Sequence, residues 1–161
     1  MTISQDQQPI ETGLSARPEP DEILAGIDLS GKNVLVTGGY SGIGLETTRA
    51  LVKAGAHVHV PARRPDTAQA ALDGIIDSAH IGQMDLGDLS SVEKFADDFL
   101  AQHDRLDILI GNAGIMACPF AKTAQGFESQ IGVNLFVQQV QHLGKLKMFK
   151  KLVLMKQSYT N

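Results

Sequence analysis

Apolar residues follow two alternating patterns along the chain. Short runs rich in β-branched residues predict strands at 33–37, 57–60, 79–84 and 106–110. Between them, apolar residues recur at three- and four-residue spacing, which predicts helices at 42–54, 66–72 and 90–102. Strands that alternate with helices form a parallel sheet with right-handed crossovers. The pattern therefore predicts an α/β fold, a partial doubly wound parallel sheet of about four to five strands with flanking helices.

Smaller signals set the expected helix boundaries and faces. Gly55 is placed to cap the first helix, and Ser90 with Glu93 forms a capping box at the start of the 90–102 helix. Residues 126–146 are a further helix candidate, and 152–155 are a doubtful extra strand. The predicted buried face of the 42–54 helix consists of Ile43, Thr47, Ala50, Leu51 and Ala54.

Polarity divides the chain into three parts. Residues 1–20 are rich in Gln, Pro, Ser and Glu and predict a mobile polar tail, followed by a possible helical turn at 21–26. Residues 21–134 hold the predicted folded domain. Residues 135–161 form a divergent, basic C-terminal end, whose lysines could meet nucleic acid or anionic lipid, although a solvated or frayed end is the favoured interpretation.

Composition narrows the class of protein. The 161 residues are 43% hydrophobic and 20% charged, as in soluble globular domains. A net charge of −4 gives no reason to expect a nucleic-acid partner. No apolar run approaches the roughly 18 residues of a membrane span, and the single Cys118 excludes an internal disulfide. We expect a cytoplasmic protein without a membrane or nucleic-acid partner.

The segment 37–44, Thr-Gly-Gly-Tyr-Ser-Gly-Ile-Gly, joins the first strand to the first helix. Gly38 permits a sharp turn, Gly42 permits backbone to approach a pyrophosphate, and Gly44 permits close packing of the helix on the strand. The helix N-terminus offers free N–H groups and a partial positive charge to phosphates. The alternative is an ordinary strand–helix turn.

This loop resembles the cofactor loop of the short-chain dehydrogenase/reductase family. Residues 106–114, Leu-Asp-Ile-Leu-Ile-Gly-Asn-Ala-Gly, resemble the family's fourth-strand signature, with Gly111 in place of its first asparagine. The similarity covers about 29–134, and this stretch resembles bacterial retinol-dehydrogenase-like members. It implies a Rossmann-like fold that binds NADP(H) through Thr37, Gly38, Tyr40, Ser41, Gly42, Ile43, Gly44, Arg63, Arg64, Asp85, Leu86, Asn112, Ala113 and Gly114.

Two of these positions also have their own chemical argument. Arg63 and Arg64 follow the second strand, where an NAD enzyme would carry Asp or Glu, and two guanidinium groups suit the 2′-phosphate of NADP. The alternative is a solvated arginine pair. The resemblance implies that Asp85 takes the adenine amino group while the Leu86 backbone supports it. The alternative for Asp85 is a turn residue ahead of a helix.

The expected catalytic set is incomplete in these 161 residues. Asn134 matches the family's catalytic asparagine, which helps to hold a proton-relay water. The chain contains no Tyr-x-x-x-Lys, and its tyrosines are Tyr40 and Tyr159. We expect an NADP(H)-binding module of an oxidoreductase whose intact members act on a small carbonyl or alcohol, with impaired catalysis. The alternative is a non-catalytic nucleotide-binding or interaction protein. Either could form a homo-oligomer or pair with a full-length relative.

Two histidines are the remaining candidates for chemistry. His57 and His59 project to one face of the second strand and could ligate a metal, but the sequence shows no partner cluster. A role in sheet packing is favoured, and no metal site is predicted. Cys118 is interpreted as a small buried thiol rather than a nucleophile.

Overall fold

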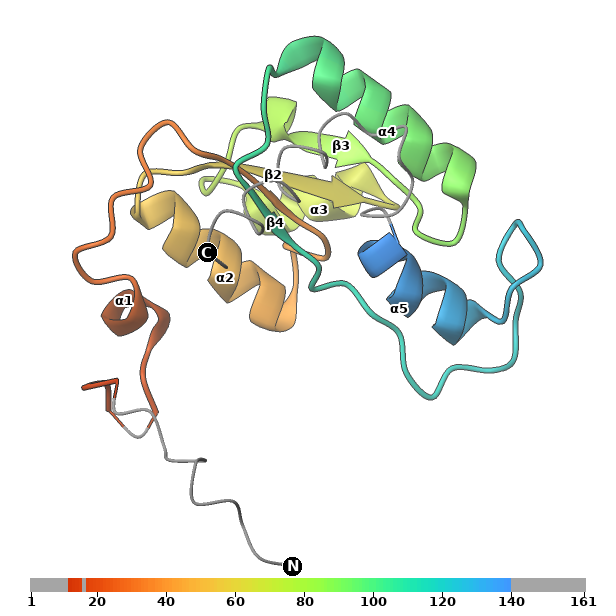
Figure 1. Cartoon of the computed structure of the whole chain (residues 1–161), viewed down its shortest axis with the longest axis horizontal. Coiled ribbons are helices and arrows are strands. Elements are labelled where there is room, and N and C mark those ends of the chain that lie inside the picture. The colour runs from red at the N-terminus through yellow and green to blue at the C-terminus, as the bar shows by residue number, and fades with distance from the viewer. Residues whose placement is uncertain (1–11, 16, 140–161) are drawn as a thin grey trace, which may run out of the picture.

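The computed structural model describes residues 12–15 and 17–139. Its sheet has four parallel strands in the order β3-β2-β1-β4 (Figure 1). They are β1 (Asn33–Val36), β2 (His57–Ala62), β3 (Ile81–Gln83) and β4 (Ile108–Ile110). The predicted parallel α/β fold is confirmed.

Helices cover both faces of the sheet. In Figure 1, α4 lies on one side of the sheet and α2 on the other. The helical elements are α1 (Pro20–Ile23), α2 (Gly42–Lys53), α3 (Pro65–Leu72), the 3₁₀ turn η1 (Ser78–His80), α4 (Leu89–Gln102) and α5 (Ser129–Gln139). None of these helices is long and apolar enough to cross a membrane.

The central strand β1 contributes to two separate cores. Val34 and Val36 belong to a cluster with Leu51 of α2 and Leu72 of α3. Leu35 belongs to a second cluster with residues of α4. Successive side chains of a strand point to opposite faces, so a strand buried on both faces must be apolar throughout. This explains the uninterrupted run that predicted the strand.

The strand boundaries differ from those expected. Strand β2 continues through Pro61 to Ala62, because Pro61 pairs with Gly82 and the Ala62 carbonyl accepts from the Met84 N–H at 2.9 Å. The predicted start of the third strand instead lies in η1, where the Asp77 side chain accepts a hydrogen bond from the Ala79 N–H. Strand β4 begins at Ile108 rather than at residue 106.

The predicted buried face of α2 was wrong at Ile43, which is 82% exposed. The buried residues of this helix are Gly44, Thr48, Ala50 and Leu51. A Cβ at Gly44 would lie 2.3 Å from the Gly38 carbonyl oxygen, so the helix turns its bare glycine toward the loop. That contact sets the rotation of α2 and turns Ile43 outward.

The cap of α4 was also predicted wrongly. The N-cap residue is Asp88 rather than Ser90, and its carboxylate accepts from the Ser90 N–H at 3.0 Å. Gly55, by contrast, follows α2 with a φ of +93°, in agreement with the predicted glycine cap.

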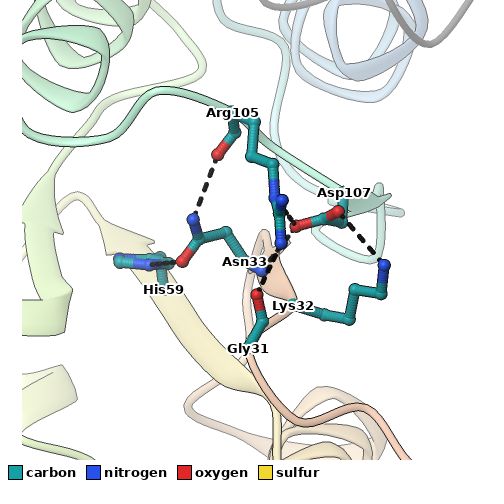
Figure 2. A network of polar contacts seen from close by, with 6 residues as sticks. All are labelled: Gly31, Lys32, Asn33, His59, Arg105 and Asp107. Atoms are coloured by element: carbon teal, nitrogen blue, oxygen red, sulfur yellow. Dashed lines mark hydrogen bonds and ion pairs between the residues drawn. The ribbon is translucent and has the colours of Figure 1, made fainter.

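A polar network joins the amino ends of β1 and β4 (Figure 2). The Asp107 carboxylate accepts from the Asn33 N–H at 2.9 Å and from the Arg105 Nε at 3.1 Å, and lies 3.6 Å from the Lys32 Nζ. Burial raises the pKa of Asp107, but these hydrogen bonds and cations outweigh it and hold the pKa below its usual range. The Asn33 amide in turn donates to the Arg105 carbonyl.

Several expectations fall outside the described residues: the structure of 1–11, the continuation of the last helix beyond 139, the strand at 152–155 and the lysine-rich end. The division of the chain at residues 20 and 134 stays a prediction.

Candidate functional site

A cleft of about 440 Å³ opens at the carboxyl ends of the strands. This edge is where ligands bind in open parallel α/β sheets. The loops after all four strands contribute to it, together with α5. The cleft is lined by Thr37, Gly38, Tyr40, Ser41, Ile43, Gly44, Pro61, Ala62, Arg63, Met84, Asp85, Leu86, Asn112, Ala113, Gly114, Ile115 and Val133. Most of the predicted cofactor residues therefore meet in one place.

The glycine loop has the conformation that its sequence suggests. Gly38 and Gly42 have φ angles of +65° and +51°, which favour glycine. A Cβ at Gly44 would meet the Gly38 carbonyl oxygen at 2.3 Å and the Asn112 amide nitrogen at 2.4 Å. A Cβ at Gly42 would meet no described atom within 4 Å. Gly44 is needed for packing inside the protein, whereas Gly42 borders open space and is absent from the cleft lining.

The first turn of α2 has no side-chain cap. Ser41 is the N-cap residue, but its hydroxyl accepts no hydrogen bond from the helix. The first N–H groups of a helix have no partner within the helix and carry a partial positive charge. Ser41, Ile43 and Gly44 line the cleft, so this positive helix end faces it.

Thr37 and Asn112 connect the ends of β1 and β4. The Thr37 hydroxyl accepts from the backbone N–H groups of Asn112 at 3.1 Å and Ala113 at 3.0 Å. The Asn112 amide donates back to the carbonyls of Thr37 at 3.0 Å and Gly38 at 3.3 Å. Through these bonds Asn112 braces the neighbouring ends of β1 and β4.

The two arginines after β2 differ in position. Arg63 lines the cleft, whereas Arg64 is the N-cap residue of α3 and is absent from the lining. Both are exposed. Within the described part of the chain, neither guanidinium forms an ion pair. One of the two predicted phosphate ligands is therefore at the cleft.

Asp85 and Leu86 lie at the cleft after β3. One carboxylate oxygen of Asp85 accepts from the Gly87 N–H at 2.8 Å, and its backbone N–H donates to the Ser91 hydroxyl at 2.9 Å. These bonds fix the turn that leads into α4. Asp85 thus has both positions considered for it, in a turn before a helix and at the cleft.

Asn134 fastens α5 to the loop after β4. Its Oδ1 accepts from the Ile115 N–H at 2.8 Å, and its Nδ2 donates to the Ile115 carbonyl at 2.9 Å. Both ends of the amide therefore hold the backbone next to Gly114. In this structure the side chain acts as a brace, and Asn134 itself is absent from the cleft lining.

A family model described as short chain dehydrogenase matches residues 32–144. This span contains every element of the cleft. The chain belongs to the short-chain dehydrogenase family.

The chain is also similar to retinol dehydrogenases. Human retinol dehydrogenase 12 is 42% identical over 113 residues, which are 67% of this chain and 36% of that protein. The chain therefore spans little more than a third of the length of this curated relative.

Solved structures of short-chain dehydrogenases give the same fold. The RhlG/NADP active-site complex of Pseudomonas aeruginosa has a TM-score of 0.59 and 29% identity, covering 74% of this chain and 49% of that one. A metagenomic short-chain oxidoreductase in complex with NADP has a TM-score of 0.57 and 32% identity, covering 68% of this chain and 52% of that one.

Sequence reasoning missed several parts of this short-chain dehydrogenase site. A Cβ at Gly39 would lie 2.7 Å from the Thr48 hydroxyl, which donates to the Gly39 carbonyl at 2.8 Å. The paired glycines in the loop were the available signal. Ile115 and Val133 line the cleft beside the recognised motifs, and no local pattern distinguishes them from ordinary apolar residues.

Proposed function

We propose that this chain binds NADP(H) in the cleft, as the cofactor-binding part of a short-chain oxidoreductase. One observation carries the proposal: the uncapped N-terminus of α2 lines the same cleft as Arg63, which forms no ion pair with any described residue. Both groups favour phosphate. No acidic residue stands at Arg63, where an NAD-selective site would use one for the ribose hydroxyls.

The residues at the cleft are of the chemical types that NADP(H) binding requires. A Cβ at Gly42 would meet nothing within 4 Å, and a pyrophosphate would lie in this open space against the N–H groups of the loop. Arg63 would hold the 2′-phosphate, and Arg64 could assist if its exposed side chain turned toward the cleft. Asp85 would take the adenine amino group. A ribose of the cofactor would lie along the backbone of Asn112, Ala113 and Gly114.

Bound NADPH supplies a hydride that reduces a carbonyl carbon, and the reverse reaction oxidises an alcohol. For this chain we infer the binding function without efficient turnover, because the sequence lacks the Tyr-x-x-x-Lys that the family uses to move the proton. The substrate class proposed for intact members is a small carbonyl or alcohol. Association with a second copy or with a longer relative is part of the proposal.

Replacing Gly42 tests whether this loop is the phosphate site. Gly42→Val should weaken NADPH binding by at least roughly tenfold, because the side chain fills the space proposed for the pyrophosphate. Gly74→Val is a matched control: Gly74 also has a positive φ, of +71°, and open space around it, but it is remote from the loop at 37–44, whose residues Ser41, Ile43 and Gly44 line the cleft. Calorimetric titration of both folded variants measures the difference. Equal affinities would refute the assignment of this loop.

A further inference from the structure

A groove of about 560 Å³ lies beside α4, separate from the cofactor cleft. Its lining includes three histidines from three different elements, His59 of β2, His80 of η1 and His103 at the end of α4. The nucleotide-binding proposal uses none of them. In the sequence they are spread over more than forty positions, so the cluster exists only in the folded chain.

His59 is at the centre of this cluster. It is 4% exposed and pairs with Leu35 in the sheet, on the face that α4 covers. Its ring centroid lies 4.7 Å from that of His80, 4.5 Å from that of His103 and 5.0 Å from that of Phe99. The more exposed His57 lies 6.4 Å from His80. The favoured packing role of His59 is thus realised, with two histidine neighbours that the sequence did not reveal.

The polar surroundings of His59 suit a neutral ring. Its Nε2 lies 3.4 Å from the Asn33 Oδ1 (Figure 2). An amide oxygen can only accept, so Nε2 carries the proton of the neutral form. A second proton would make the ring cationic in a site that holds no carboxylate partner for it. Among the described residues, the Asp107 carboxylate accepts a hydrogen bond from the Asn33 backbone N–H. It does not contact His59.

The other charged groups around the cluster have partners of their own or lie at its rim. On α4, Lys94 and Asp98 line the groove and form an ion pair with each other. Asp77, next to η1, acts on His80 and favours its protonated form. The remaining neighbours are the histidines themselves, and each protonation opposes the next.

We propose that His57, His59, His80 and His103 form a proton-operated latch, which holds η1 and the end of α4 against β2 while the rings are neutral. Protonation of His59 and His80 as the pH falls would charge two rings that face each other across this contact. The docked elements would then separate locally, at the end of the sheet opposite to the cofactor cleft.

The pH dependence of docking follows from the difference in histidine pKa between the docked and the open state. Burial lowers the pKa of His59 to about 4, and the neighbouring His103, His80 and His57 add to the shift. Burial also lowers the pKa of His80, against the opposing effect of Asp77. Because the open state takes up protons near the ordinary histidine pKa of 6.5, docking is fully favoured above that pH and weakens as the pH falls toward 4. Between pH 7.5 and pH 5, the His59 shift alone should raise the open population on the order of ten- to thirtyfold.

Hydrogen exchange of the 161-residue chain at pH 7.5 and pH 5.0 tests the latch. Expressed as protection factors, the amides of β2, η1 and the end of α4 should lose at least roughly tenfold more protection at pH 5.0 than those of α2. In His80→Gln/His103→Gln this selective loss should decrease by the part that these two rings add to the His59 shift, whereas Arg49→Gln, on an exposed part of α2, should leave it unchanged. Uniform loss across all elements, or none, would overturn the proposal.

A second measurement needs no variant. Nuclear magnetic resonance titration of the histidine rings in the unmodified chain should show His59 taking up its proton below pH 5, together with exchange or chemical-shift changes at the end of α4. A His59 ring that titrates near pH 6.5 with no change in α4 would overturn the latch.

Discussion

At the scale of single residues, side chains at the cleft often hold backbone rather than face a ligand. The Thr37 hydroxyl accepts hydrogen bonds from two N–H groups of the loop after β4. The Asn134 amide forms two hydrogen bonds with the backbone of Ile115. Asn112 likewise donates its amide to the carbonyls of Thr37 and Gly38. The partner of Asn134 could not be predicted, because it depends on how α5 returns to the sheet.

Arg63 provides the sharpest residue-scale prediction. Arg63→Ala should weaken the binding free energy of NADPH by about 1.5–3 kcal/mol, the range for a hydrogen bond to a charged group. NADH, which lacks the 2′-phosphate, should lose little. Arg64→Ala should have a smaller effect, because Arg64 does not line the cleft. Calorimetric titration of both variants with both nucleotides checks this. An unchanged NADPH affinity in Arg63→Ala would remove the assigned role.

At the scale of elements, the sequence predicted which segments are helices and strands better than where they begin. The spacing of apolar residues identifies a helix or a strand. The first and last residues of that helix or strand depend on contacts with residues distant in the chain. Asp88 caps α4 because its carboxylate also accepts from the Gln125 amide, 37 residues away, at 3.0 Å. Strand β2 reaches Ala62 because β3 pairs with it. Neither the Gln125 contact nor the pairing of β3 with β2 could be predicted from local patterns such as the capping box at Ser90.

The cap of α4 gives an element-scale prediction with a pH dependence. Asp88→Ala should lower the melting temperature at pH 7 more than Ser90→Ala does. Hydrogen bonds from Gln125 and from the Ser90 backbone hold the pKa of Asp88 below its ordinary value of 3.8. Its stabilising effect is therefore present above that value and is lost as the pH falls below it. Thermal unfolding from pH 7 to pH 3 should show the deficit of Asp88→Ala shrinking. A larger deficit for Ser90→Ala would restore Ser90 as the cap.

At the scale of the whole molecule, the parallel sheet gathers at one edge residues that lie far apart in the sequence. The loop at 37–44, Arg63, Asp85 and residues 112–114 meet in one cleft because each follows a strand at its carboxyl end. This convergence was predictable from strand order and motif resemblance. The histidine cluster was not, because His80 and His103 carry no pattern that links them to β2.

The 161 residues contain no Tyr-x-x-x-Lys, and this leads to an expectation for the chain when it is assayed alone. With NADPH and an aldehyde or ketone, we expect no reduction above the background of the cofactor alone. Loss of general acid–base help typically costs 10²–10⁴-fold. Absorbance of NADPH at saturating cofactor measures the rate, with an intact family member as the positive control. Sustained turnover would mean that residues outside the recognised motifs supply the proton.

The most direct test of the nucleotide-binding account is a calorimetric titration of the unmodified chain with NADPH and, separately, with NADH. The uncapped α2 terminus facing the cleft predicts saturable binding of one nucleotide per chain. Arg63 at the lining predicts that NADPH binds at least roughly tenfold more tightly than NADH. Failure of a folded chain to bind NADPH, or binding of NADH with equal or higher affinity, would contradict the account.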